Sequence, residues 1–172
     1  MARPAPASSS SGPQTATLAA ASLTQVGYST HNNGNVHDCG AFVPPSGVSD
    51  TTNGEVRGQL DNAKGSFEGF LRLPDGATVT SFALMVNDAD NDDDVIAYLI
   101  RRNVADGLDK LKGYLVMARA SSDGAVVNTI RRFEDTSITG KVVDNSHFAH
   151  FVELIDCGVP EPFAVSVTRT NG

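Results

Sequence analysis

Residues 79–86 and 95–100 are two strongly apolar segments, separated by the acidic run NDADNDDD at positions 87–94. Each segment has the length of a β-strand rather than of a helix, and Asn and Asp are turn-forming residues. The sequence therefore predicts two strands joined as a hairpin, with the acidic run at its turn. Apolar residues occupy both alternations of each strand, so both faces of the strands need a cover.

The same rhythm of short apolar segments and turn residues continues along the chain. The further strand-like segments are residues 65–73, 114–120, 125–133, 147–155 and 163–170. PDG at positions 74–76 has the residue order of a tight turn, and SSDG at positions 121–124 predicts a second hairpin. With 16 Gly and 8 Pro in 172 residues, the sequence predicts an all-β fold, a two-sheet antiparallel sandwich of jelly-roll type.

The composition indicates one globular domain with a short tail. Hydrophobic residues make up 40% and charged residues 19% of the chain, and 172 residues are enough for one sizeable core. Residues 1–14, rich in Pro, Ala and Ser, predict a flexible low-complexity tail, and residues 15–172 the β-sandwich domain. No run of about 18 apolar residues occurs, so no membrane span is predicted.

The chain carries a formal net charge of −7 at pH 7. Nucleic-acid affinity comes largely from Lys and Arg side chains that neutralise phosphates, and no basic cluster offsets the aspartates. Nucleic acid is therefore not an expected partner.

The two cysteines, Cys39 and Cys157, belong to neither a CxxC motif nor a Cys/His metal pattern. We predict a disulfide between them, which on the chain-entropy model would stabilise the fold by about 4–5 kcal/mol. Such a bond indicates an oxidising compartment and hence an extracellular or secreted protein. The alternative is two buried free thiols in a cytosolic protein. The first residues lack the apolar stretch of a signal peptide, which is also how a mature exported protein would begin.

The acidic run has two interpretations, a solvated turn and a Ca²⁺ site. The candidate ligands, at alternate positions of the run, are Asp88, Asp90, Asp92 and Asp94. This spacing supplies oxygens as a Ca²⁺ loop does, but Asp93 stands where an EF-hand has Gly and Leu99 where it has a bidentate Glu. A polar turn is the default interpretation, and Ca²⁺ is the one cofactor that the sequence suggests.

The apolar residues of the predicted hairpin suggest self-association, because a sandwich buries only one face of each sheet. The candidate interface residues are Phe82, Leu84, Val86, Ile96, Tyr98 and Ile100. The expected partner is a second copy of the chain or another extracellular protein.

No catalytic constellation is visible in the sequence, and we assign no catalytic residue. No G-x-S-x-G motif occurs, and His147 and His150, three apart in a predicted strand, point to opposite faces. Glu153 is the acid of interest, because a buried carboxyl in an apolar strand would have a raised pKa. An outward position of Glu153 in a half-exposed strand is the alternative, and the chain is not expected to be an enzyme.

Several short motifs recur in an order that resembles a group of largely uncharacterised secreted bacterial domains. They are LPDGATVT (73–80), the acidic run, YLIRR (98–102), FEDTSI (133–138), VDNSHFAHF (143–151) and AVSVTR (164–169). In that group the corresponding scheme is LPxGAxV, DND, LYR, FxDTxI, DNxxYxY and GVRIxY. This chain departs from it by using His and Phe where the DN strand has Tyr, and by lacking the terminal Tyr. The resemblance implies a β-sandwich fold and export, and no particular activity.

These observations lead to three functional hypotheses. The first is a non-catalytic exported binding or structural module that self-associates or docks onto a protein partner. The second is a Ca²⁺-dependent carbohydrate or cell-surface binding domain, although the chain has no Trp and only 6% aromatic residues with which to stack sugars. The third is a hydrolase that uses Glu153.

Overall fold

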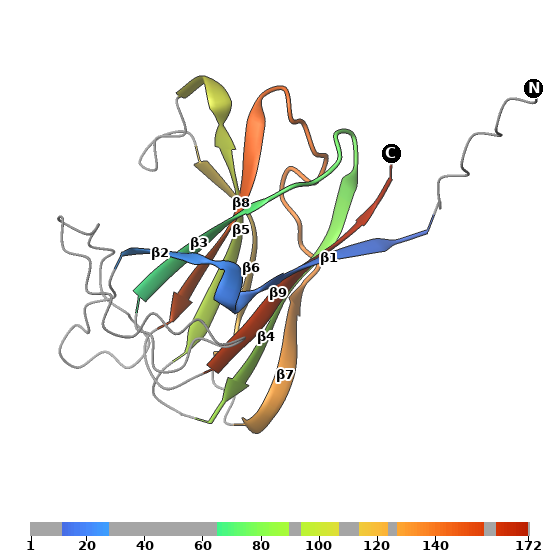
Figure 1. Cartoon of the computed structure of the whole chain (residues 1–172). Coiled ribbons are helices and arrows are strands. Elements are labelled where there is room, and N and C mark those ends of the chain that lie inside the picture. Colours follow the sequence, from blue (N-terminus) through green and yellow to red (C-terminus); the bar gives the residue numbers. More distant parts are fainter. Residues whose placement is uncertain are drawn as a thin grey trace, which may run out of the picture.

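The computed structural model describes residues 12–27, 65–89, 94–106, 114–123, 127–156 and 161–171. These residues form nine strands and two 3₁₀ turns. The elements are β1 (Gln14–Ala19), η1 (Ala20–Ser22), β2 (Thr24–Gly27), β3 (Gly65–Leu71), β4 (Thr78–Asp88), β5 (Val95–Asn103), η2 (Val104–Asp106), β6 (Tyr114–Ser121), β7 (Val127–Asp135), β8 (Phe148–Asp156) and β9 (Glu161–Thr170). The strands lie in two layers packed face to face (Figure 1), which confirms the predicted all-β sandwich.

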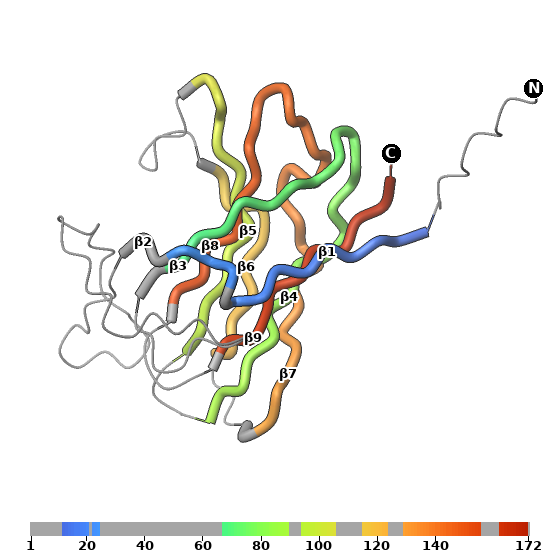
Figure 2. The backbone as a smooth tube through the Cα atoms, in the orientation of Figure 1, coloured from blue at the N-terminus to red at the C-terminus, as the bar shows by residue number. Residues whose placement is uncertain are grey.

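The order of the strands is that of a jelly roll. One sheet has the order β1-β9-β4-β7 and the other β2-β3-β8-β5-β6. The pairs β1·β9, β3·β8, β4·β7 and β5·β6 are all antiparallel and nested in sequence, as if one long hairpin had been rolled up. Figure 2 lets the first strand be followed alongside the last. β1 begins at Gln14, and no helix of the described residues has the length and hydrophobicity to cross a membrane.

The core lies between the two sheets and is built from the inward alternation of the central strands. β4 contributes Phe82 and Leu84, β5 contributes Leu99, and β8 contributes Val152 and Leu154, all wholly buried. Burying one such side chain stabilises the fold by about 1.5–3 kcal/mol. The apolar segments recognised in the sequence therefore hold the sandwich together.

The two predicted hairpins are wrong. β4 pairs with β7 and β9, whereas β5 pairs with β6 and β8, so the acidic run connects one sheet to the other. Likewise, the strand that ends at Ser121, β6, and the next strand, β7, belong to different sheets, so SSDG does not join a hairpin. A strand, a polar turn and another strand give the same local pattern whether the chain turns within a sheet or crosses between sheets. The partner of each strand is set by the core that the two sheets share.

Half of the predicted interface lies inside the protein. The β4 members of the set are Phe82, Leu84 and Val86, and all three are 0% exposed between the sheets. A bulge between Val79 and Ser81 shifts the alternation and also brings Val79 into the core. These side chains cannot contact another protein unless the sandwich opens.

The β5 members of the predicted interface lie on the outer face of the five-stranded sheet. Ile96 and Tyr98 are half-buried, and Ile100 is 2% exposed within a single chain. Within a single chain, this outer face therefore exposes less apolar surface than the sequence suggested, and less of it requires a second copy as a cover. Self-association stays a prediction.

Truncating the core should be far more costly than truncating the surface. We expect Leu84→Ala to lower the free energy of unfolding by about 2–5 kcal/mol, because it leaves a cavity between the sheets. Ile130 on β7 is 57% exposed and serves as the control. Ile130→Ala should cost about 1 kcal/mol or less in the same urea titration. Equal losses in the two variants would contradict the placement of Leu84.

Candidate functional site

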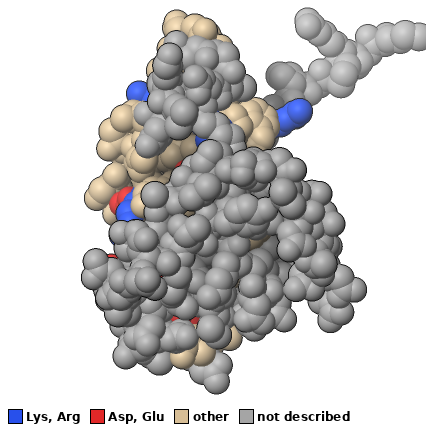
Figure 3. Space-filling view, turned by 90° about the vertical axis from the view of Figure 1, so that its left-hand side faces the viewer, with Lys and Arg blue, Asp and Glu red and all other residues tan. Residues whose placement is uncertain are grey.

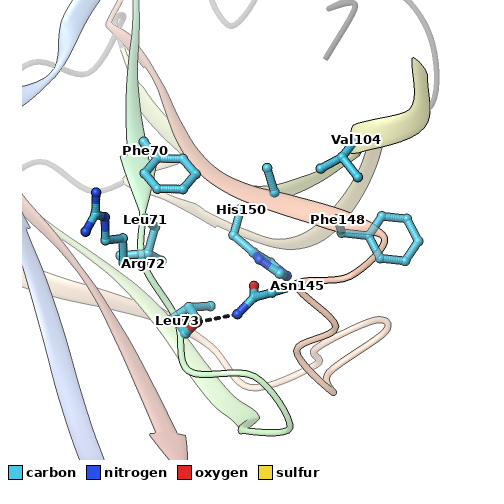
Figure 4. A pocket seen from close by; sticks show the side chains of 9 residues that line it. Phe70, Leu71, Arg72, Leu73, Val104, Asn145, Phe148 and His150 are labelled. Carbon is cyan, nitrogen blue, oxygen red and sulfur yellow. Dashed lines mark hydrogen bonds between the residues drawn. The ribbon is translucent and has the colours of Figure 1, made fainter. Parts of the chain in front are cut away.

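The candidate site is a pocket where β3 and β8 separate at one end of the sandwich. The two strands pair as far as Leu71 and His150, beyond which the chain diverges into a fork. Figure 4 shows the space between the branches, a cavity of about 490 Å³. Its lining residues are Phe70, Leu71, Arg72, Leu73, Val104, Asn145, Phe148, Ala149 and His150. We refer to this cavity as the fork pocket.

Asn145 joins the two branches of the fork. Its Nδ2 donates a hydrogen bond to the carbonyl oxygen of Leu73 at 2.9 Å, and its backbone N–H donates to Oδ1 of Asp75 at 2.8 Å. The backbone adds two bonds, from the N–H of Gly76 to the oxygen of Val143 and from the N–H of Val143 to the oxygen of Ala77. The LPDGA and DN motifs therefore meet in space beside the pocket.

The turn before β8 contains a Ser, a His and an Asp in mutual contact. Ser146 Oγ donates to Asp144 Oδ1, and Nδ1 of His147 lies 2.7 Å from Asp144 Oδ2 and 3.0 Å from Ser146 Oγ. A catalytic triad places Ser and Asp on opposite ring nitrogens, whereas both meet the same nitrogen here. The hydrogen bonds from Ser146 and then from His147 lower the pKa of Asp144 to about 2. This cluster fixes the turn.

Arg101 supports the pocket from the side of β5. Its Nη1 donates to the oxygen of Gly140 at 3.3 Å, and its guanidinium carbon lies 4.3 Å from the centre of the Phe148 ring. Gly140 has a φ of +57°, and a Cβ there would lie 2.7 Å from Nη1 of Arg101. Both the positive φ and the close approach of Arg101 therefore require Gly at position 140. The cation–π contact of Arg101 holds the Phe148 ring at the wall of the pocket.

His150 lies in the floor of the pocket and is almost wholly buried. Burial lowers its pKa, and the positive charge of Arg101 lowers it further, while Asp144 acts in the opposite direction. Nε2 of His150 has no hydrogen-bond partner among the described residues. A buried polar atom of this kind is uncommon in a folded protein.

Phe70 forms the open wall of the pocket and is 54% exposed. Its ring packs edge-to-face on Phe151, with centroids 5.5 Å apart at 70°. The guanidinium of Arg102 lies 4.5 Å from the centre of the Phe151 ring and forms an ion pair with Glu68. Phe70 thus rests on a fixed support and turns its free side to solvent.

The predicted Ca²⁺ ligands are only partly within the described residues. Asp88 and Asp94 are 1% and 8% exposed at the ends of β4 and β5, so the ends of the acidic run point inward. Asp90 and Asp92 lie outside the described residues. Within the described ranges, no group of three or more His, Cys, Asp and Glu residues has a metal-binding arrangement. Ca²⁺ binding stays a prediction.

The remaining predicted site residues do not converge on the pocket. Cys39 and Cys157 lie outside the described residues, as do residues 1–11 of the predicted tail. Glu153 is half-buried and faces outward, paired in register with Glu68 and Tyr98. Its outward position is the second of the two alternatives that the sequence left open.

Sequence reasoning missed the residues that form the pocket, although two signals were present. Phe70 interrupts the alternation of its strand, and an aromatic residue on the polar alternation of a strand is a sign of an exposed ring. Asn145 and Gly76 belong to the recurring motifs, whose positions in the fold are not apparent from the sequence.

A second cavity of about 400 Å³ lies beside the start of β4. It is lined by Thr78, Val79, Thr80, Thr136, Ser137, Ile138 and Lys141. Its described lining includes no aromatic ring, in contrast to the fork pocket. Figure 3 shows that, on the described part of one face, basic and acidic side chains are scattered and do not form a patch of one sign.

Comparisons with known proteins reveal only remote likenesses. No protein-family model matches the sequence, and no curated protein matches it. Among solved structures, the chain is similar to a xylan-binding module, CBM15, at 10% identity and a TM-score of 0.39, covering 64% of this chain and 74% of that one. It is similar to Eiger TNF from S. frugiperda at 7% identity and a TM-score of 0.36, covering 95% and 88%.

A third solved structure is a family two carbohydrate esterase from Cellvibrio japonicus, at 9% identity and a TM-score of 0.33. The match covers 92% of this chain and 35% of the esterase, so the chain spans about a third of that protein.

Two glycines allow the support of the pocket to be tested. Gly76 and Gly140 both have positive φ, so alanine at either should cost about 1–2 kcal/mol of folding free energy. A Cβ at Gly76 meets open space, whereas one at Gly140 displaces Arg101 from its carbonyl and from the Phe148 ring. We expect Gly140→Ala to cost about 1 kcal/mol more than Gly76→Ala in chemical denaturation. A smaller loss for Gly140→Ala would contradict the role of Arg101.

The buried imidazole predicts a pH dependence of stability. The folded-state pKa of His150 lies below the ordinary value of 6.5, so above that pH the residue is neutral in both states. As the pH falls below 6.5, the unfolded chain takes up a proton that the folded chain resists. The free energy of unfolding should therefore fall until the pH passes the folded-state pKa.

The measurement is the urea midpoint between pH 7.5 and pH 5. The decrease should be smaller in His150→Gln than in the wild type, whereas His147→Gln, which changes an exposed His, should keep the pH dependence that His150 causes. Identical pH profiles for the wild type and His150→Gln would show that His150 is not the group responsible.

Proposed function

We propose that the protein is an exported, non-catalytic binding module that takes a small ligand into the fork pocket. The observation that carries this proposal is the cavity at the fork, whose lining combines the half-exposed ring of Phe70 with the side chains of Asn145 and His150. Apolar walls with a few convergent polar groups are typical of small-ligand sites. A volume of about 490 Å³ is within the usual range of such sites.

The construction of the pocket also supports binding. Asn145 ties both branches of the fork together, and Arg101 and Phe151 hold the rings of Phe148 and Phe70. A ligand that enters such a preformed site loses little binding free energy to reorganisation of the protein. The resemblance of the motifs to those of secreted bacterial domains supports export.

Protein-observed NMR with a mixed fragment library tests the proposed site for many classes of ligand at once. The library should contain sugars, aromatic acids, amides and alcohols. We expect the fragments that bind to shift the Val104 methyl and His150 imidazole signals saturably. Ile138 in the second cavity and the exposed Ile130 serve as reference methyl groups and should not shift. Shifts confined to Ile138, or none at Val104 and His150, would contradict the proposal.

A further inference from the structure

β7 is an open edge of the four-stranded sheet. It stands at the end of the order β1-β9-β4-β7, so among the described strands it pairs with β4 alone. Figure 1 shows β7 at the outer margin of the sandwich. The open side of an edge strand presents backbone N–H and C=O groups that can pair with a strand of another chain.

The neighbouring edge, that of β6 in the other sheet, is covered. The N–H of Arg119 on β6 donates to Oδ2 of Asp135 at 2.9 Å, and the N–H of Thr139 donates to the carbonyl oxygen of Met117 at 2.8 Å. The chain that leaves β7 therefore bonds to the edge of β6. Within the described ranges, no backbone hydrogen bond of this kind reaches the open edge of β7.

The side chains along β7 are exposed. Ile130 is 57% exposed, and the side chains of Arg132 and Glu134 are 44% and 35% exposed. Arg132 and Glu134 lie on the outer face of the sheet and form an ion pair, in which Nη2 of Arg132 donates to Oε1 of Glu134 at 2.8 Å. Phe133, between them, packs against the core from the inner face. The strand thus presents both a free backbone edge and charged groups to a partner.

The sequence RRFED at positions 131–135 is complementary to itself by charge. Consider two copies of β7 that run antiparallel with Phe133 opposite Phe133. Arg132 of each copy then lies opposite Glu134 of the other, and Arg131 lies opposite Asp135. Opposite charges placed directly across two strands stabilise the pair, and like charges destabilise it. Every charged pair in this arrangement is of opposite sign.

Other registers of the same two strands lose this match. A shift of one residue would put side chains of the outer face opposite those of the inner face. The next registers that keep the faces aligned are centred on Arg132 or on Glu134, and each brings two identical charges together at the centre. Charges of one sign would protect an edge by repelling a second copy, whereas the order of charges in β7 favours one particular pairing.

We propose that two copies of this chain associate through β7, antiparallel and centred on Phe133, so that their four-stranded sheets join into one continuous sheet. Both copies use the same surface, as a two-fold dimer requires. This interface differs from the one that the sequence suggested, which included Ile96 and Tyr98 of the other sheet. β7 contributes no residue to the fork pocket, so the inference is independent of the proposed function.

The first test is sedimentation equilibrium of the full chain over a wide range of protein concentration. We expect the apparent mass to rise with concentration from 18.0 kDa towards that of a dimer. Arg132→Glu and Glu134→Arg each oppose like charges at two places in the dimer, so each should weaken association about tenfold or more. A wild-type protein that stays monomeric at every concentration would overturn the inference.

Mixing the two variants separates pairing between copies from effects within one chain. In an equimolar mixture, each variant meets opposite charges on the other, so we expect a dimer of one copy of each to form. Neither variant has the intrachain ion pair of Arg132 and Glu134, so that pair cannot explain the recovery.

Arg72→Glu, at an exposed position after β3 of the other sheet, is the matched charge control and should leave dimerisation unchanged. Urea denaturation verifies that each variant is folded. A dimer that persists in both single variants, or that does not return on mixing them, would place the interface elsewhere and overturn the inference.

Discussion

The hydrogen bond from the Asn145 side chain to the carbonyl oxygen of Leu73 ties the two branches of the fork to one another. It connects the chain that has left β3 to the chain about to enter β8. The backbone bonds between Gly76, Ala77 and Val143 continue the same connection. This link gives the carbonyl oxygen of Leu73 a hydrogen-bond partner at the point where the two strands separate. The pocket is thus a supported opening in an otherwise closed sandwich.

The nested pairing of the strands explains why one end of the molecule carries the site. A jelly roll brings the β3–β4 connection and the start of β8 together, although they are about seventy residues apart in the sequence. Asp144 and its neighbours shape the turn before β8, and Arg101 reaches Gly140 and the Phe148 ring from β5. Segments that are remote in sequence therefore each contribute a hydrogen bond or a packing contact that holds the small cavity in shape. The core between the sheets supplies the stability of the fold.

The sequence was sufficient to predict the strands and the fold class but not the way the strands pair. Periodicity and turn residues identify each strand, because they report on the strand itself. Pairing depends on contacts with distant strands, so the acidic run between β4 and β5 has the local pattern of a hairpin turn, and nothing local shows that Phe82 is buried. The bulge after Val79 also has no local signature. The pocket was missed for the same reason, since Phe70 and Asn145 meet only through the topology.

The central claim is that the fork between β3 and β8 is the place where this protein binds its ligand. The most direct measurement is an isotope-filtered NOE spectrum of the labelled protein with an unlabelled fragment that binds it. We expect NOEs from the protons of the fragment to the aromatic protons of Phe70 and the methyl protons of Val104. NOEs to Ile138 of the second cavity instead, with none to Phe70, would contradict this claim.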